Sequence, residues 1–420
     1  MVNRVLMVAY HYPPVQVSSG LQRTLAFSRY LGDYGWSPLI LSAHTRAYAD
    51  TNDDQLRDIP QGVPVIRAFA LNSRKHLSLG GRYLDLLALP DPWSSWWFGG
   101  VWSGLRLIRK YRPKVIWSTY PIATSHLIGL TLHKLTGLPW IADFRDSMTE
   151  PTYPREEARR RVFLWIEKKT IQACSKAVFT TPGAVSMYQK RYPGEPDGKW
   201  LQLPNGYNED IFAEIETAAI SPCLTASPQK DTRAVKLIHS GVIYPDERDP
   251  EVFFQALSNL KKRRLIDKQR LNIILRATGH DESFQKSLNR LVIDDIVQMK
   301  PRIPYRHALK EMLSADGLII LQAANCNHQV PAKLYEYFRA RRPILALTDA
   351  SGDTAHTLRE AGLSDIAPLD DVGSIEQALL QFITSIENGS ATVASDIVIE
   401  KYSRRTSSQK LAVCLDSLTG

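Results

Sequence analysis

A lysine followed three residues later by a glutamate is the strongest local sign of chemistry in this sequence. Lys333 and Glu336 come after Gln329-Val330-Pro331-Ala332, and Pro331 stands where a helix over 331–340 is expected to begin. Residues three apart share nearly one helix face, so this face would offer a cation to a diphosphate and a carboxylate to ribose hydroxyls. The alternative is a Lys–Glu pair worth only about a few tenths of a kcal/mol.

A second candidate cation, Arg248, lies at the start of another expected helix. It follows the expected strand Val235–His239, the pair Ser240-Gly241 and the segment Tyr244-Pro245-Asp246-Glu247. A guanidinium binds phosphate through two parallel hydrogen bonds, which makes this position suitable for a phosphorylated ligand. The spacing is equally compatible with a solvated charge in a loop.

Charged residues also follow a strand in the first half of the chain. Asp143-Phe144-Arg145-Asp146 comes directly after the expected strand Pro139–Ala142. Because ligands bind beyond the carboxyl ends of parallel strands, these side chains would face a ligand, and we expect them to hold sugar hydroxyls, with Arg145 held by one of the acids. The alternative is a structural ion pair that caps the next helix.

Gly20 lies at the turn between the first expected strand, Val5–Tyr10, and a helix over 20–32, after Val17-Ser18-Ser19. A glycine at such a turn lets backbone N–H groups approach an anion, although a plain tight turn would also use one. The turn lacks the GxGxxG pattern, which disfavours a nicotinamide-dependent enzyme.

The elements around these residues alternate, which predicts parallel sheets built from βαβ units. Further expected strands are 37–41, 114–118, 176–180, 272–277, 296–299, 317–322 and 343–347, and further helices are 122–135, 155–173 and 250–262. The alternation of strands and helices begins again after Pro204-Asn205-Gly206, and residues 214–234 are expected to form a polar loop. We therefore expect a first domain over 1–205, a second over 206–402, and a terminal helix over 403–420.

Composition restricts the class of protein. The chain has 420 residues, 44% hydrophobic and 23% charged, which excludes a disordered chain. Its four cysteines form no CxxC pair, which excludes a disulfide scaffold and a cysteine zinc site and is typical of a reducing compartment. The net charge of +9 indicates an anionic partner: nucleic acid, a phosphorylated substrate or an acidic membrane surface.

Aromatic and basic residues cluster in the first half. Four tryptophans, Trp93, Trp96, Trp97 and Trp102, precede a basic stretch over 106–112, and a second basic stretch covers 159–169. Tryptophan favours the membrane interface and Lys/Arg favour anionic head groups, so we expect peripheral contact with a membrane. Packing in the core, or a subsite for stacking sugars, is the alternative.

Taken together, these pieces resemble the retaining glycosyltransferases of family 4, most closely the bacterial members that build surface polysaccharides. The resemblance rests on the following pieces, in this order: Tyr12-Pro13-Pro14, Gly20, Arg23, Asp143-Phe144-Arg145-Asp146, Pro204-Asn205-Gly206-Tyr207, His239-Ser240-Gly241, Tyr244, Arg248-Asp249-Pro250, Pro331, Lys333 and Tyr335-Glu336-Tyr337. It implies the GT-B fold, an α/β architecture of two Rossmann-like, doubly wound domains facing a cleft.

The family implies roles for individual residues. Arg248 and Lys333 would be catalytic, by neutralising the leaving diphosphate. The donor would be bound by Gly20, Gly241, Tyr244, Tyr335 and Glu336. The acceptor side would hold Arg23, Thr119, Asp143, Arg145 and Asp146. No metal or cofactor is implied beyond the nucleotide sugar itself, which would be UDP- or GDP-linked.

Three positions depart from the family pattern. The first acid of its Glu-x7-Glu motif falls at His328, the arginine of its Gly-Arg pair falls at Val242, and a histidine that many members keep aligns with Thr119. These departures keep a catalytically inactive relative in consideration.

The resemblance implies a retaining, metal-independent, hexosyltransferase-like enzyme. It would move a sugar to a glycan or lipid-diphosphate-linked acceptor, in the cytoplasm or on the inner face of the membrane. The alternatives are a nucleotide-sugar epimerase of the same fold and an inactive glycan- or nucleotide-binding relative. A nucleic-acid binder is disfavoured, because the basic residues are spread over both halves without a known module.

Overall fold

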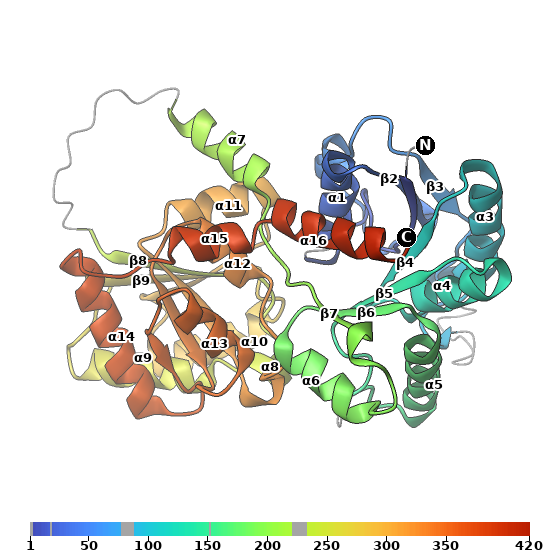
Figure 1. Cartoon of the computed structure of the whole chain (residues 1–420). Coiled ribbons are helices and arrows are strands. Elements are labelled where there is room, and N and C mark those ends of the chain that lie inside the picture. The colour runs from blue at the N-terminus through green and yellow to red at the C-terminus, as the bar shows by residue number, and fades with distance from the viewer. Residues whose placement is uncertain (1–2, 17–18, 77–87, 151–152, 221–232) are drawn as a thin grey trace. The chain divides into compact units, whose positions relative to one another are not determined.

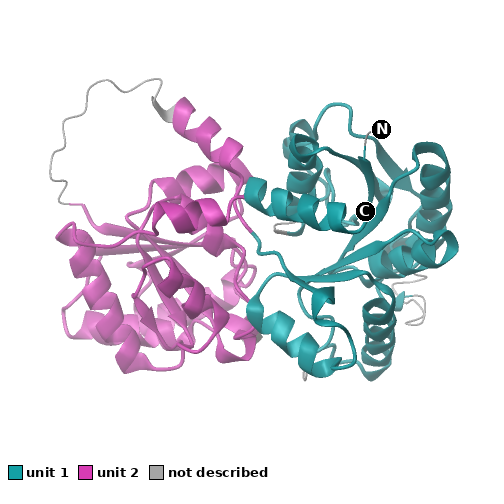
Figure 2. Ribbon diagram, viewed as in Figure 1, with its two compact units in different colours: residues 1–205, 404–420 teal, residues 206–403 magenta. Residues whose placement is uncertain are grey.

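The computed structural model describes residues 3–16, 19–76, 88–150, 153–220 and 233–420. The chain divides into two compact units (Figure 2), and each is built around one parallel sheet (Figure 1). Unit 1 comprises Met1–Asn205 together with Arg404–Gly420, and unit 2 comprises Gly206–Ser403. Among the described residues, no helix is long and apolar enough to cross a membrane.

The sheet of unit 1 has seven strands in the order β3-β2-β1-β4-β5-β6-β7. Their bounds are β1 (Asn3–Val8), β2 (Trp36–Ala43), β3 (Val65–Ala68), β4 (Val115–Thr119), β5 (Trp140–Arg145), β6 (Lys176–Phe179) and β7 (Trp200–Gln202). All neighbouring strands are parallel. The chain order reverses beside β1 and β4, and ligands of such sheets bind at the carboxyl ends of strands near that point.

Helices cover both faces of this sheet. They are α1 (Ser19–Tyr30), α2 (Ser73–His76), α3 (Trp96–Tyr111), α4 (Ala123–Thr136), α5 (Glu157–Ala173), α6 (Pro182–Arg191) and α16 (Arg404–Ser417). Because strand side chains alternate between faces, Val5 and Met7 pack into the core with α1 and α16, while Leu6 and Val8 pack into the core with α3 to α6.

The sheet of unit 2 has six strands in the order β10-β9-β8-β11-β12-β13. Their bounds are β8 (Val235–Ser240), β9 (Leu271–Arg276), β10 (Val297–Lys300), β11 (Gly317–Gln322), β12 (Ile344–Thr348) and β13 (Ile366–Ala367). The helices are α7 (Glu209–Ile220), α8 (Pro245–Arg248), α9 (Glu251–Lys262), α10 (Asp281–Leu291), α11 (Tyr305–Leu313), α12 (Lys333–Arg339), α13 (Asp353–Glu360), α14 (Val372–Glu387) and α15 (Asp396–Lys401). Two buried cores, one on each face, hold this unit together.

Some expected elements differ in the structure. The polar loop expected over 214–234 is wrong at its start: α7 extends to Ile220, because Ile211, Phe212 and Ile215 recur at helical spacing and pack into the core. The rest of that segment, 221–232, lies outside the described residues. The helix expected at Pro331 begins at Lys333 instead.

Candidate functional site

The candidate donor residues of unit 2 lie at the carboxyl end of β8. Gly241 follows this strand with a φ of 115°, a backbone conformation that favours glycine. A Cβ atom at this position would lie 3.1 Å from the Nζ of Lys333. The first residue of α12 therefore places its ammonium directly against the backbone at the end of β8.

Lys333 is held by His239, a residue of the His239-Ser240-Gly241 piece to which the resemblance assigned no role. Its Nζ lies 2.9 Å from Nε2 of His239, and Nδ1 of the same ring lies 3.0 Å from the carbonyl oxygen of Ile319. Because a carbonyl only accepts, Nδ1 carries the proton, and Nε2 accepts from Lys333. His239 therefore positions the lysine as a neutral hydrogen-bond acceptor.

Burial strongly disfavours charge on this pair. It lowers the pKa of Lys333 well below its ordinary value, nearby Arg248 lowers it further, and only Glu336 opposes the shift. The pKa of His239 is likewise lowered by burial and by Lys333. A buried cation without a counter-ion is costly, and a bound anion would relieve that cost.

Arg248 ends the short helix α8, and its guanidinium lies 5.8 Å from the centre of the Tyr244 ring. Its nearest carboxylate, Glu247, is 4.0 Å away, and among the described residues its buried Nε has no hydrogen-bond partner. Two basic side chains with weak acidic compensation thus lie near one another. This arrangement is suited to an anionic ligand.

The other predicted donor residues differ in their surroundings. Glu336 accepts a hydrogen bond of 2.6 Å from the hydroxyl of Tyr305, which holds its carboxylate in place. Tyr335 is buried, with its ring centre 4.7 Å from that of Tyr402, so it packs in the core. Its neighbour Tyr337 accepts a hydrogen bond from the backbone N–H of Ser240, a contact that fixes the end of β8 and that sequence reasoning did not anticipate.

In unit 1, an acid near the end of β5 forms an ion pair that the sequence did not predict. Asp143 is fully buried and pairs with Arg23 of α1 at 2.7 Å and 3.3 Å, whereas the expectation was that one of the two acids, Asp143 or Asp146, holds Arg145. Arg23 also donates to the carbonyl of Pro204. The Asp143–Arg23 pair forms because α1 packs across the sheet and brings a residue 120 positions away to this strand.

Arg145 instead lies beneath the turn that carries Gly20. Its backbone has a φ of 57°, its guanidinium donates to the carbonyl of Tyr120 at 3.3 Å, and among the described residues its buried Nε has no partner. The ring of His11 lies in the same place, and burial together with Arg145 lowers the pKa of His11 to about 3. Val17 and Ser18 of this turn lie outside the described residues.

The two remaining acceptor-side residues lie at neighbouring strand ends. Thr119 ends β4, is buried and donates from its hydroxyl to the carbonyl of Tyr120. Asp146 follows β5 and is exposed. Thr119, Arg145 and Asp146 therefore come from adjacent strands at the carboxyl edge of the sheet.

We expect Gly20→Ala to destabilise the protein by about 1–3 kcal/mol through overpacking. The added Cβ would lie 2.7 Å from Nδ1 of His11 and 2.9 Å from Arg145, closer than such contacts normally come. Gly32→Ala is the control, since no atom lies within 4 Å of its added Cβ. Urea unfolding of both variants measures the difference, and equal stabilities would show that the turn has room for a side chain.

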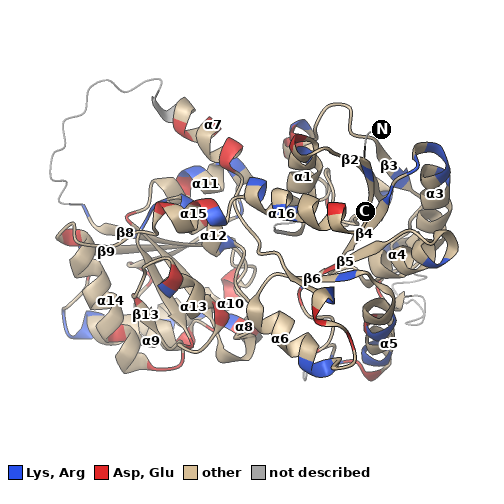
Figure 3. Cartoon of the chain, in the orientation of Figure 1, with Lys and Arg blue, Asp and Glu red and all other residues tan. Residues whose placement is uncertain are grey.

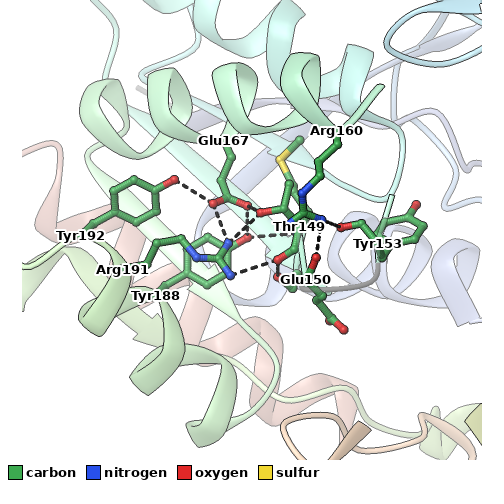
Figure 4. A network of polar contacts seen from close by, with 10 residues as sticks. Thr149, Glu150, Tyr153, Arg160, Glu167, Tyr188, Arg191 and Tyr192 are labelled. Atoms are coloured by element: carbon green, nitrogen blue, oxygen red, sulfur yellow. Dashed lines mark hydrogen bonds and ion pairs between the residues drawn. The ribbon is translucent and has the colours of Figure 1, made fainter. Parts of the chain in front are cut away.

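A buried polar network anchors the chain that follows β5 (Figure 4). The carboxylate of Glu167 accepts hydrogen bonds from Thr149, Tyr188, Arg191 and Tyr192. These groups join the loop to α5 and α6. The contacts span 18 to 25 residues of sequence, and no motif marked them.

Comparison with known proteins agrees with this architecture. Residues 19–206 match a family described as "Glycosyl transferase 4-like domain". The match covers most of unit 1, including Arg23 of α1 and the strand ends that carry Thr119 and Arg145. No curated protein sequence matches the chain.

Solved structures extend the likeness beyond residues 19–206. Sucrose-phosphate synthase from Thermosynechococcus elongatus has a TM-score of 0.66 at 13% identity, over 99% of both chains. Anabaena Alr3699/HepE in complex with UDP and glucose has a TM-score of 0.67 at 12% identity, over 99% of this chain and 100% of that one. Trehalose 6-phosphate synthase from Burkholderia multivorans has a TM-score of 0.65 at 12% identity, over 100% and 97%. The predicted fold class, α/β of the GT-B type, is thereby confirmed.

Proposed function

We propose that this chain is a retaining glycosyltransferase that moves a sugar from a nucleotide-sugar donor to a glycan or lipid-linked acceptor during the assembly of surface polysaccharide. The glycosyl transferase 4-like domain and the GT-B fold support the reaction class. One observation carries the donor site: the half-buried Lys333 lies against a neutral histidine, beside Arg248, with no carboxylate hydrogen-bonded to its Nζ among the described residues.

The reaction is a front-face displacement in which the acceptor oxygen bonds to the anomeric carbon as the bond to phosphate breaks. The acceptor proton passes to the departing phosphate oxygen. The ammonium of Lys333 and the guanidinium of Arg248 stabilise the negative charge that grows on the leaving nucleotide diphosphate. Fixed charges of this kind are commonly the largest catalytic contribution, because they need no reorganisation during the reaction.

The donor to test first is a UDP-hexose, because the Anabaena relative was solved with UDP and glucose. Glu336 would accept the ribose hydroxyls in this proposal, with Tyr305 holding the carboxylate in place. GDP-hexoses are the second set of donors to test. No metal is included in the proposal, so EDTA should leave turnover unchanged, and a loss of turnover that magnesium restores would contradict this part.

A donor screen followed by product analysis tests the proposal. A donor at 100 times its dissociation constant should stabilise the protein by about 2.7 kcal/mol, which a thermal shift detects. Product analysis with an acceptor panel then separates three outcomes. Transfer supports the proposal, epimerised donor without acceptor indicates an epimerase, and binding without any conversion indicates an inactive relative.

We expect donor affinity to fall as pH rises. Burial and Arg248 lower the pKa of Lys333 in the free protein, whereas a bound diphosphate favours its ammonium form. Between these two pKa values binding takes up a proton, so the dissociation constant should rise by up to about tenfold per pH unit there and stay constant below the free-protein pKa.

Calorimetry of donor binding in buffers of different ionisation enthalpy counts the protons directly. Proton uptake should be present in the natural protein and absent in Lys333→Met, which cannot be protonated. Equal uptake in both proteins would assign the effect to another group.

A further inference from the structure

Helix α3 presents one outward row of side chains in which aromatic groups are followed by cations. Phe98 is 70% exposed and Trp102 is 64% exposed, and the exposed residues Arg106 and Lys110 continue the row at the same four-residue spacing. The guanidinium of Arg106 lies 5.4 Å from the centre of the Trp102 ring. Aromatic side chains of this size lose free energy by remaining in contact with water.

The rest of the tryptophan cluster belongs to the core. Trp96 is fully buried, and Trp93 and Trp97 pack against the same core while their indole nitrogens donate to the carbonyl of Ala47 and to the hydroxyl of Thr131. For these three tryptophans the packing alternative of the sequence analysis is confirmed. Core packing therefore explains these three tryptophans but not Trp102, whose side chain faces solvent.

Neighbouring helices also expose apolar side chains. Near the end of α4, Leu135 is 62% exposed, and α5 exposes Trp165 by 54% and Leu164 by 39%. Helices α3, α4 and α5 cover the same face of the sheet of unit 1 and pack side by side (Figure 1). We call these three residues, together with Phe98 and Trp102, the outer aromatic face.

The chain around this face is strongly basic. Residues 92–142 contain six Lys or Arg and no Asp or Glu. Figure 3 shows Lys and Arg on α3 and along α5. Two of the cations on α5 already have partners within unit 1: Arg161 pairs with Glu157, and Arg160 donates to backbone carbonyls. Helix α3 has no acidic residue with which its cations could pair.

We propose that the outer aromatic face binds an anionic phospholipid surface. Tryptophan and phenylalanine favour the boundary between head groups and acyl chains, and Lys and Arg are attracted to anionic head groups just outside it. The inference concerns the place where the protein works and does not depend on the transfer reaction. A nucleic acid would also attract the cations, but it would give no reason to expose Leu135 and Leu164.

Vesicle co-sedimentation of the full chain tests whether the exposed aromatic side chains contribute to membrane binding. The protein should bind phosphatidylglycerol-containing vesicles at low salt, bind pure phosphatidylcholine weakly, and dissociate as salt increases. Phe98→Ser with Trp102→Ser should weaken binding at least tenfold. The control is Ile397→Ser with Val413→Ser. These two apolar side chains lie outside the outer aromatic face and are 84% and 64% exposed, so their removal should leave vesicle binding unchanged.

A charge-matched pair of triple variants tests the electrostatic part. Arg106→Gln, Arg109→Gln and Lys110→Gln together should weaken binding at least tenfold, since each cation near an anionic surface contributes about fivefold. The control removes three exposed lysines of unit 2, Lys262, Lys268 and Lys286, each to glutamine. Thermal unfolding of each variant verifies that it is folded.

The outcomes separate lipid from other partners. Loss of vesicle binding in both α3 variants but in neither control supports the proposal. Equal losses of vesicle binding in the α3 and control triple variants would show that binding depends only on net charge, and would overturn the proposal. Absence of vesicle binding, or binding of a single-stranded RNA that the aromatic substitutions leave unchanged, would also overturn it.

Discussion

Lys333→Met should lower glycosyl transfer by about a hundredfold or more while the protein stays folded. Loss of one preorganised group that stabilises developing charge costs about 3 kcal/mol of barrier. The same substitution removes a half-buried amine whose charged form is disfavoured in the free protein and whose hydrogen bond runs to neutral His239, so the free energy of unfolding should change little. A large loss of rate with retained stability is the combination that a purely structural lysine would not produce.

Steady-state turnover with a donor found in the screen, together with urea unfolding, measures both quantities. Lys310→Met is the matched control, because Lys310 lies exposed on helix α11 of the same unit. It should leave both rate and stability unchanged. Full turnover in folded Lys333→Met would exclude this residue from the reaction. Unfolding of that variant alone would make the lysine a structural group instead.

Asp143→Asn should destabilise the protein by about 3–5 kcal/mol, because it leaves the buried Arg23 guanidinium without its counter-ion. The side chains of Arg23 and Asp143 are only 2% and 0% exposed, so water cannot compensate for the lost carboxylate. The exposed pair Arg405–Asp33 in the same unit is the control, with side chains 51% and 47% exposed. Asp33→Asn should cost about 1 kcal/mol or less.

Urea unfolding of the two asparagine variants checks this difference, and it also decides what Asp143 does. A large loss of stability makes Asp143 chiefly a support that joins α1 to the end of β5. If stability is retained while the Michaelis constant for the acceptor rises, the carboxylate contacts the acceptor instead, as the sequence analysis expected.

Local patterns predicted most of the sheet but missed its short strands. The apolar runs at 37–41 and 317–322 became β2 and β11, with β2 longer at both ends. Strands β3, β7 and β13 have four, three and two residues, too few to show an alternating pattern. They lie at the sides of the sheets, where pairing with an existing neighbour defines them.

In the candidate site too, short motifs predicted some residues, and only the fold showed the part played by others. Motifs selected Lys333, Arg248 and Glu336, since their types and helix positions suit a diphosphate and a ribose. They included His239 and Tyr337 but gave neither a role, because a histidine or tyrosine alone has no spacing that marks its partner. His239 and Lys333 are 94 positions apart and meet only because β8 and β11 are neighbours.

The order of residues alone thus determined the alternation of strands and helices, the glycine at the first turn and the surplus of positive charge, because each depends on composition or on a short period along the chain. The folded arrangement decided that Asp143 pairs with Arg23, that Lys333 lies against a histidine, and that Trp96 is covered while Trp102 faces water. Those outcomes depend on strand order and on the rotation of each helix about its axis. Both are set by the packing of the whole unit, to which distant segments contribute as much as neighbours.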